Sequence, residues 1–141
     1  MKERKERKET LKSAKKKAWG VFSEYIRRRN ADFGGFCRCV TCGVKKHWKE
    51  MQAGHFIGGR GNSILFDEKG VHPQCPKCNI FNHGEQLEYF YWMEKEYGRE
   101  VIDELRQKKK KPQKMTVYDY QQIRNLYADM LVGLDIRDKL I

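Results

Sequence analysis

The chain has 141 residues and a formal net charge of +11, so it has the length of one compact domain and a large excess of positive charge. It contains no run approaching the ~18 apolar residues of a membrane span, and Met1 is followed by charged residues rather than by the apolar stretch of a secretory signal. Composition therefore argues against a membrane or secreted protein, predicts a cytoplasmic location, and favours a polyanionic partner such as nucleic acid.

The first segment, residues 1–35, is predicted to be a basic helix. Residues 1–30 hold twelve lysines and arginines against four glutamates, a balance suited to contact with DNA phosphates. The candidate DNA-binding residues on this helix are Lys15, Lys16, Arg27 and Arg28. An apolar stripe at helical spacing must be covered by C-terminal helices or by a second subunit, and it consists of Leu11, Ala14, Ala18, Trp19, Phe22, Tyr25 and Ile26.

The middle segment, residues 36–84, is rich in Cys, His and Gly and too short to bury a large core, so a bound metal is expected to stabilise it. It contains two CxxC pairs, and two residues between thiolates allow both sulfurs to reach one ion. The predicted ligands of a structural, four-cysteine zinc site are Cys39, Cys42, Cys75 and Cys78. Cys37 is an alternative ligand to Cys39 or, with better odds, a free thiol beside the pair.

Between the cysteine pairs, the predicted order is strand, loop, strand and helix. One strand is expected near residues 51–57, a second near 63–67 after a glycine-rich loop at 57–62, and a helix after the second cysteine pair. The segment is therefore predicted to be a ββα unit stabilised by zinc.

Three polar residues of this unit suggest hydrolytic chemistry. His55 lies on the first predicted strand and can serve as a general base, because a neutral imidazole accepts a proton near pH 7. Asn79 and His83 would share one face of a helix and hold a catalytic Mg²⁺ or Mn²⁺ ion. Arg60, on the loop after the base, is a further candidate for phosphate contact.

Each of these residues also has a purely structural interpretation. His55 can be a packed strand histidine, Asn79 can cap the following helix, and His83 can end it. The functional interpretation gains weight only because the three occur together, inside a double CxxC frame, on a basic chain.

The last segment, residues 85–141, is predicted to be helical. One aromatic-faced helix should end near Gly98, and a second should contain Val101, Ile102 and Leu105. The like-charged run 108–112 ends in proline and is expected to be a linker. Thr116 is the predicted N-cap of the last helix, with Asp119 three residues later. The apolar face of that helix is expected to contain Ile123, Leu126, Tyr127, Met130, Leu131 and Leu134.

The order CxxCG, GHF, CxxCN and a later histidine resembles the HNH or His-Me finger nucleases, including phage endonuclease VII. More specifically, the run CVTCG…WKEMQAGHFIGGRGNSILFDEKGVHPQCPKCN resembles the NinG (Rap) family of phage recombination proteins, and so do KKAWGVFSEYIRRR before it and GEQLEYFYWMEKEYG after it. The resemblance covers roughly residues 11–105.

This resemblance implies an α+β fold that is mainly helical around a zinc-stabilised ββα-metal motif. It places the four paired cysteines on the zinc ligands, His55 on the general base, Asn79 on a catalytic-metal ligand and His83 on the third motif position. The implied activity is cleavage of branched DNA such as Holliday junctions in a phage-infected bacterial cell. Paired cuts in a four-way junction further imply a homodimer.

Two positions depart from the family pattern. Gly54 stands where many HNH enzymes carry an Asp or His metal ligand, and Gly70 stands where the central Asn that orients the base is expected. Candidate replacements for the third metal ligand are Asp67, Glu68, His72 and, less favoured, Gln52. His72 is also a candidate for orienting the base, although a plain β-strand histidine fits equally well. The alternative function is a non-catalytic zinc-finger protein that binds DNA or RNA, or one that recruits recombinases.

Overall fold

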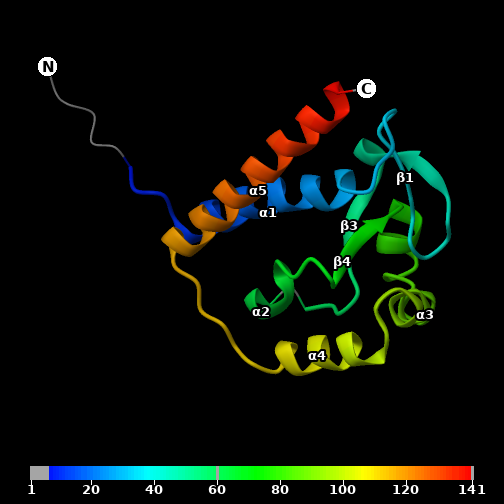
Figure 1. Cartoon of the computed structure of the whole chain (residues 1–141). Coiled ribbons are helices and arrows are strands. Elements are labelled where there is room, and N and C mark those ends of the chain that lie inside the picture. The colour runs from blue at the N-terminus through cyan, green and yellow to red at the C-terminus, as the bar shows by residue number, and fades with distance from the viewer. Residues whose placement is uncertain (1–6, 60, 141) are drawn as a thin grey trace, which may run out of the picture.

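The computed structural model describes residues 7–59 and 61–140, and their helices and strands form three layers (Figure 1). In chain order the elements are α1 (Leu11–Arg28), β1 (Phe36–Arg38), β2 (Lys45–His47), a 3₁₀ turn (Trp48–Glu50), β3 (Gln52–His55), α2 (Asn62–Leu65), β4 (Val71–Gln74), a π-helical turn (Lys77–Phe81), α3 (Gln86–Tyr97), α4 (Arg99–Lys109) and α5 (Val117–Lys139). Helices α1 and α5 lie side by side and cover one face of the β3–β4 hairpin, while α3 and α4 lie on its other side (Figure 1). The protein is thus mainly helical, with two small antiparallel sheets.

Helix α1 begins where a polar cap allows it. The Thr10 side chain accepts a hydrogen bond from the Ser13 backbone N–H at 3.1 Å, and residues 7–10 precede the helix. The helix is therefore shorter than the predicted range 1–35, of which residues 1–6 lie outside the described part of the chain. Apart from Leu11, which is 55% exposed, its apolar stripe packs against α5 and the sheet, so these residues are covered within one chain rather than by a second subunit.

Helix α5 confirms the predicted N-cap. Thr116 and Asp119 form a reciprocal capping box, in which each side chain accepts from the other residue's backbone N–H at 3.2 and 2.8 Å. The preceding linker lies later in the chain than the predicted 108–112, because α4 continues to Lys109 and α5 begins only at Val117. Gly98 separates α3 from α4 with φ +87°, as the predicted helix break requires.

The second strand of the central hairpin is not where the sequence predicted it. Residues Asn62–Leu65 form the short helix α2, and β4 is instead Val71–Gln74, paired with β3 so that Gly54 faces His72. An apolar run of four or five residues suits a buried helical turn as well as a strand, which explains the wrong prediction. β4 was missed because Pro73 weakens any strand pattern, yet both strands of a two-stranded sheet are edges, where proline is tolerated.

The segment after the second cysteine pair is also different from the prediction. Lys77–Phe81 form a π-helical turn rather than the start of a long helix, and α3 begins only at Gln86. His83 follows this turn with φ +53°, in the left-handed region. Asn79 and His83 therefore do not share a helix face, although the chain brings both to the same cavity.

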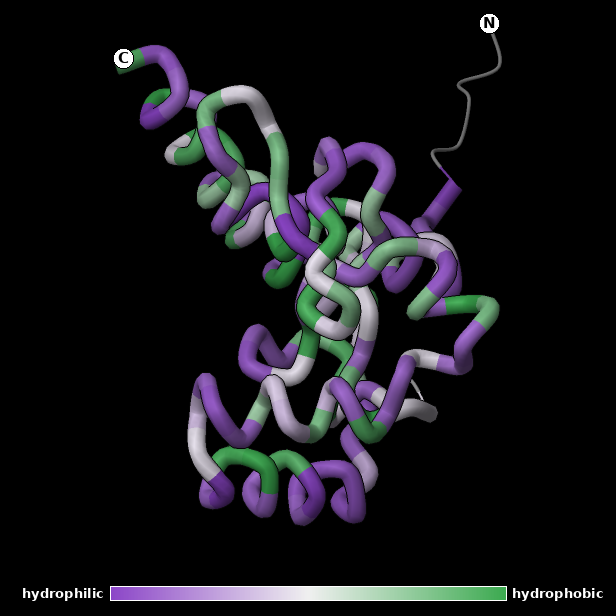
Figure 2. The backbone as a smooth tube through the Cα atoms, turned by 90° about the vertical axis from the view of Figure 1, so that its right-hand side faces the viewer, coloured by the Kyte–Doolittle hydropathy of each residue, from purple (hydrophilic) through white to green (hydrophobic). Residues whose placement is uncertain are grey.

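Hydrophobic and hydrophilic segments alternate along the tube of the backbone, and the C-terminal turns of α5 project from the body (Figure 2). Among the described residues, no helix has the length and apolar character required to cross a membrane.

Candidate metal centre and active-site cavity

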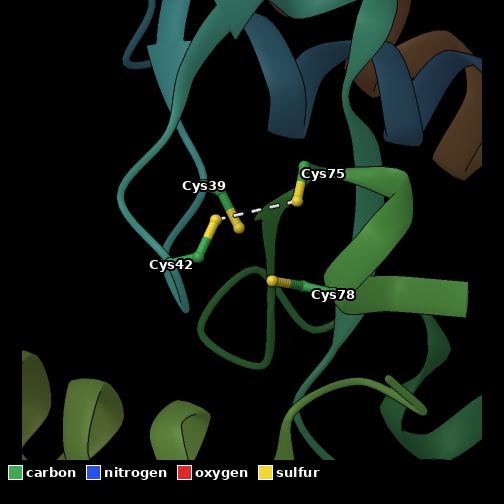
Figure 3. Close-up of side chains that lie close together, drawn as sticks. All are labelled: Cys39, Cys42, Cys75 and Cys78. Atoms are coloured by element: carbon green, nitrogen blue, oxygen red, sulfur yellow. Dashed lines mark hydrogen bonds between the residues drawn. The ribbon is translucent and has the colours of Figure 1, made fainter. Parts of the chain in front are cut away.

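Four cysteine sulfurs converge on one point between the two CxxC turns (Figure 3). The sulfur atoms of Cys39, Cys42, Cys75 and Cys78 lie within 4.8 Å of one another. The sulfurs of Cys42 and Cys75 are 3.7 Å apart, close to the ~3.8 Å edge of a tetrahedron with zinc–sulfur bonds of about 2.3 Å. The predicted ligand set can therefore hold a structural metal ion such as zinc.

Local backbone geometry directs these sulfurs inward. The first pair occupies the turn of the β1–β2 hairpin, closed by the hydrogen bond from Gly43 N to Cys39 O and by a positive φ of 77° at Gly43. The second pair opens the π-helical turn, where Asn79 N donates to Cys75 O at 3.0 Å. The metal site thus joins the β1–β2 hairpin to the end of β4.

The pKa values of the clustered cysteine thiols also fit a bound cation. Burial alone raises the pKa of Cys39, but hydrogen bonds from the Thr41 hydroxyl and from nearby backbone groups outweigh it and bring that pKa to about 6. Burial, together with the neighbouring thiols of Cys75 and Cys42, raises the pKa of Cys78 to about 12. Four sulfurs at this spacing need a bound cation to be thiolates together.

Cys37 does not belong to this cluster of ligands. It is 6% exposed and packs beside the site on β1, but its sulfur is not one of the four that converge. Burial raises its pKa, followed by a lowering effect of Arg27. The structure thus favours the predicted free thiol over the alternative in which Cys37 replaces Cys39.

A cavity of about 550 Å³ beside the metal centre brings together the three residues singled out for hydrolysis, His55, Asn79 and His83. Arg27 also lines it, whereas Lys15, Lys16 and Arg28 do not, and Arg60 lies outside the described residues. The other lining residues are Trp19, Ser23, Met51, Gln52, Ala53, Gly58, Gly84 and Gln86. No carboxylate appears among these described lining residues.

His55 is held from two directions. Its ring stacks on Trp19 of α1, with centroids 5.0 Å apart and planes at 20°. Its Nε2 atom lies 3.1 Å from the Leu65 carbonyl oxygen, which can only accept, so Nε2 carries the proton and Nδ1 the lone pair of the neutral ring. The Leu65 carbonyl thus orients the imidazole, a task for which the sequence offered only His72 as a candidate.

The amide of Asn79 is oriented by Gln52. Its Nδ2 atom donates to Gln52 Oε1 at 2.7 Å, so the Asn79 Oδ1 atom is the one that a cation would take. Gln52, the least favoured candidate for a third ligand, is the only one of the four candidates that lines the cavity. The donor set is neutral, consisting of amide oxygens and an imidazole.

The other three candidate ligands are engaged elsewhere. Asp67 accepts from Lys108 Nζ at 2.7 Å, and Glu68 accepts from the Tyr127 hydroxyl at 3.1 Å. His72 is 3% exposed and bonds to the Lys69 carbonyl and to Arg29 at 2.7 and 3.1 Å. Burial lowers the pKa of His72 to about 4, so it is a neutral structural histidine of the strand and neither orients His55 nor faces the cavity.

The glycine before His55 has a physical explanation in Gln74 on the facing strand. A Cβ atom at position 54 would overlap the fully buried Gln74 side chain. That side chain donates from Nε2 to the Thr41 hydroxyl at 3.1 Å and to the Gly84 carbonyl at 2.9 Å. Gln74 therefore connects the first CxxC turn to the turn that carries His83, and it fills the space that a side chain at position 54 would need.

Sequence reasoning missed three contributors to this site. Trp19 was assigned only to the apolar stripe of α1, the role of the Leu65 carbonyl has no side-chain signal, and Gln74 has no motif. Only Trp19 could have been found, because it shares a helix face with the basic residues Lys16 and Arg27.

Comparison with known proteins identifies the family. Residues 1–136 match the family described as Bacteriophage Lambda NinG protein. This chain belongs to the NinG family. Among NinG relatives, it is 27% identical over 120 residues to Protein ninG of Escherichia phage 933W, which covers 84% of this chain and 57% of the relative. It is 27% identical to Protein ninG of Salmonella phage P22 over 124 residues, or 87% of this chain and 57% of the relative.

The NinG protein of Escherichia phage lambda is 28% identical over 91 residues, covering 64% of this chain and 42% of the relative. The chain therefore spans about half the length of the curated NinG proteins that it matches. No solved structure matches it.

Proposed function

We propose that this NinG-family chain is a metal-dependent endonuclease that hydrolyses phosphodiester bonds in branched recombination intermediates such as Holliday junctions. The observation that carries the proposal is the single cavity in which His55, Asn79, His83 and Arg27 meet, beside a four-cysteine metal centre. The net charge of +11 adds the affinity for a polyanion that such a substrate requires.

Each of these residues has a separate role in the proposed hydrolysis. His55 takes a proton from water, whose oxygen attacks phosphorus as the bond to the 3′ oxygen breaks. The departing 3′ oxygen takes a proton from solvent, so the products are a 5′-phosphate and a 3′-hydroxyl. Asn79, His83 and Gln52 would hold a divalent Mg²⁺ or Mn²⁺ ion, which supplies positive charge to the phosphate and the leaving oxygen. Arg27, which also lines the cavity, stabilises the same developing charge.

Arg27 is well placed for this role. Its Nε and Nη1 atoms donate to the carbonyls of Ser23 and Trp48 at 3.1 and 3.3 Å, and its guanidinium lies 5.2 Å from the Trp48 ring. A guanidinium carries five N–H donors, so these bonds hold the group in place without exhausting its capacity to bind phosphate.

The substrate implies an assembly. A four-way junction cut on two strands needs two active centres, so we propose that the active form is a homodimer. Its interface lies outside the apolar stripe of α1, because α5 covers that stripe within the chain.

The test uses a labelled synthetic four-way junction and a matched linear duplex, with Mg²⁺ or Mn²⁺ present or withheld. We expect paired, metal-dependent cuts on the junction and a loss of at least about 100-fold in rate for His55→Ala, the range of a lost general base. Cys37→Ser is the control, since that thiol lies outside the metal ligands. Binding without cleavage by wild type in every metal would refute the nuclease and leave a zinc-stabilised DNA-binding or recombinase-recruiting protein.

A further inference from the structure

One face of α1 leads directly into the cavity. Residues three and four apart share a helix face, and the positions Lys12, Lys16, Gly20, Ser23 and Arg27 follow that spacing. Ser23 and Arg27 line the cavity, together with Trp19 from the edge of the same face. Lys12, Lys16 and Gly20 are exposed and continue the face away from it. We call these five spaced positions the α1 track.

The charge of the α1 track is of one sign. Three of its five residues are basic, and Glu24 is the single carboxylate between Leu11 and Arg28. Glu24 is turned to the side of the track, where it pairs with Arg28 at 3.4 Å. The opposite face of α1 is buried, with Ala18, Phe22 and Ile26 fully covered. The track face is therefore open to a large ligand.

The shape of the α1 track allows close approach. Gly20 stands at its middle, and a Cβ atom added there would have no heavy atom within 4 Å. A glycine inside a helix costs about 0.5–1 kcal/mol relative to alanine, and here no contact within the described chain requires it. Because Gly20 has no side chain, the backbone of a large ligand can approach the helix closely at this position.

The length of the α1 track suits a DNA strand. Lys12 and Arg27 are separated by about 22 Å along the helix axis at 1.5 Å per residue, which corresponds to roughly six base pairs along the axis of a duplex at about 3.4 Å each. Because the track ends at Arg27 in the cavity, a strand lying along it would deliver a phosphate to His55.

We propose that the α1 track binds the phosphate backbone of one double-stranded DNA arm and guides it into the cavity, with Lys12, Lys16 and Arg27 as phosphate contacts and Gly20 as the point of closest approach. This inference rests on the proposed function, because it takes DNA as the substrate. It selects one face of the basic helix and excludes Arg28, which binds Asp135 on α5 at 2.6 Å.

The experiment measures binding of the full chain to a duplex and to a four-way junction without divalent metal, across a series of salt concentrations. The double variant Lys12→Gln, Lys16→Gln should weaken binding about ten-fold and reduce the salt slope by about two, since each lost phosphate contact contributes about 0.9. The charge-matched control is Lys17→Gln, Lys114→Gln, because Lys17 lies about 100° around the helix from Lys16 and pairs with Glu9. It should retain wild-type affinity within two-fold.

Two further variants test the geometry. Lys12→Arg, Lys16→Arg keeps the charge and should keep the affinity, whereas Gly20→Glu adds bulk and negative charge to the track and should weaken binding at least ten-fold. Equal losses in the double variant and its charge-matched control would overturn the proposal in favour of diffuse attraction. Equal affinity for duplex RNA, with the same variant pattern, would overturn the assignment of DNA as the ligand.

The outcomes separate this inference from the proposed function. If wild type shows track-dependent binding but cuts nothing, the nuclease fails and the DNA track stands. If wild type cuts the junction and the Lys12→Gln, Lys16→Gln variant binds and cuts equally well, the track fails and the nuclease stands. Thermal unfolding of each variant, expected to match wild type at these exposed positions, verifies the fold.

Discussion

Gln74 on β4 fills the space beside Gly54 on β3, and its amide joins the first CxxC turn to the turn that carries His83. Any side chain at position 54 would force Gln74 to move, and because Gln74 is fully buried, that movement would break its bonds to Thr41 and Gly84.

Gly54→Ala should therefore destabilise the protein by about 1–3 kcal/mol, the usual range for overpacking. Urea unfolding measures the change in the free energy of unfolding. Gly20→Ala is the matched control and should be neutral or stabilising, since its Cβ meets nothing within 4 Å. In a Gln74→Ala background the cost of Gly54→Ala should largely disappear; equal costs in both backgrounds would show that the two residues are not coupled.

Metal analysis of the purified protein should find one zinc ion per chain. Cys75→Ser removes a ligand that is 3% exposed, so zinc content should fall and the middle segment should unfold, because a structural site contributes its binding energy to folding. Cys37→Ser should retain the full zinc content, since that sulfur lies outside the cluster. Zinc lost equally from both variants would place Cys37 among the ligands.

The neighbouring arginines Arg27 and Arg28 should respond differently to the same substitution. Arg27→Gln removes a charge from the cavity and should lower the rate of junction cleavage about 100-fold, comparable to the loss of one charge-stabilising donor. Arg28→Gln should leave the rate unchanged and lower the melting temperature, because Arg28 ties α1 to Asp135 on α5. Similar losses of rate in both variants would argue against a specific role for Arg27.

Stability should depend on pH through His72. Its pKa is about 4 in the folded protein and about 6.5 when unfolded, so the unfolded chain binds the extra proton between these values and stability falls as pH drops through that window. The expected loss between pH 7 and pH 5 is roughly 2 kcal/mol, at 1.36 kcal/mol per pKa unit. Urea unfolding at both pH values should show a smaller loss in His72→Gln; an equal loss would assign the effect to other groups.

The cysteine pairs and the helices could be predicted from sequence because their signals are local. CxxC spacing, the Thr116 cap and the apolar stripe of α1 each depend on residues a few positions apart, and each corresponds to the structure. The cavity residues His55, Asn79 and His83 were also found, although the predicted shared helix face was replaced by a π-helical turn and a left-handed His83.

What sequence could not provide depends on contacts between distant segments. The strand predicted near 63–67 is instead the short helix α2. Ser63, Ile64 and Leu65 are all buried, and a continuous run of buried residues has no periodicity that would distinguish a helix from a strand. Trp19 stacks on His55, which lies 36 positions later in the sequence, and Gln52 forms a hydrogen bond with Asn79, which lies 27 positions later. No local pattern encodes either contact.

The pairing of α1 with α5 has a consequence for synthesis of the protein. Phe22 and Tyr127 pack edge to face with ring centroids 4.8 Å apart, so their contact closes a loop of roughly 100 residues. On the ribosome, α1 emerges long before α5 and must carry its apolar stripe uncovered until nearly the whole chain has been made. The nascent chain can bind zinc early at its middle, but this half of the core can close only near the end of translation.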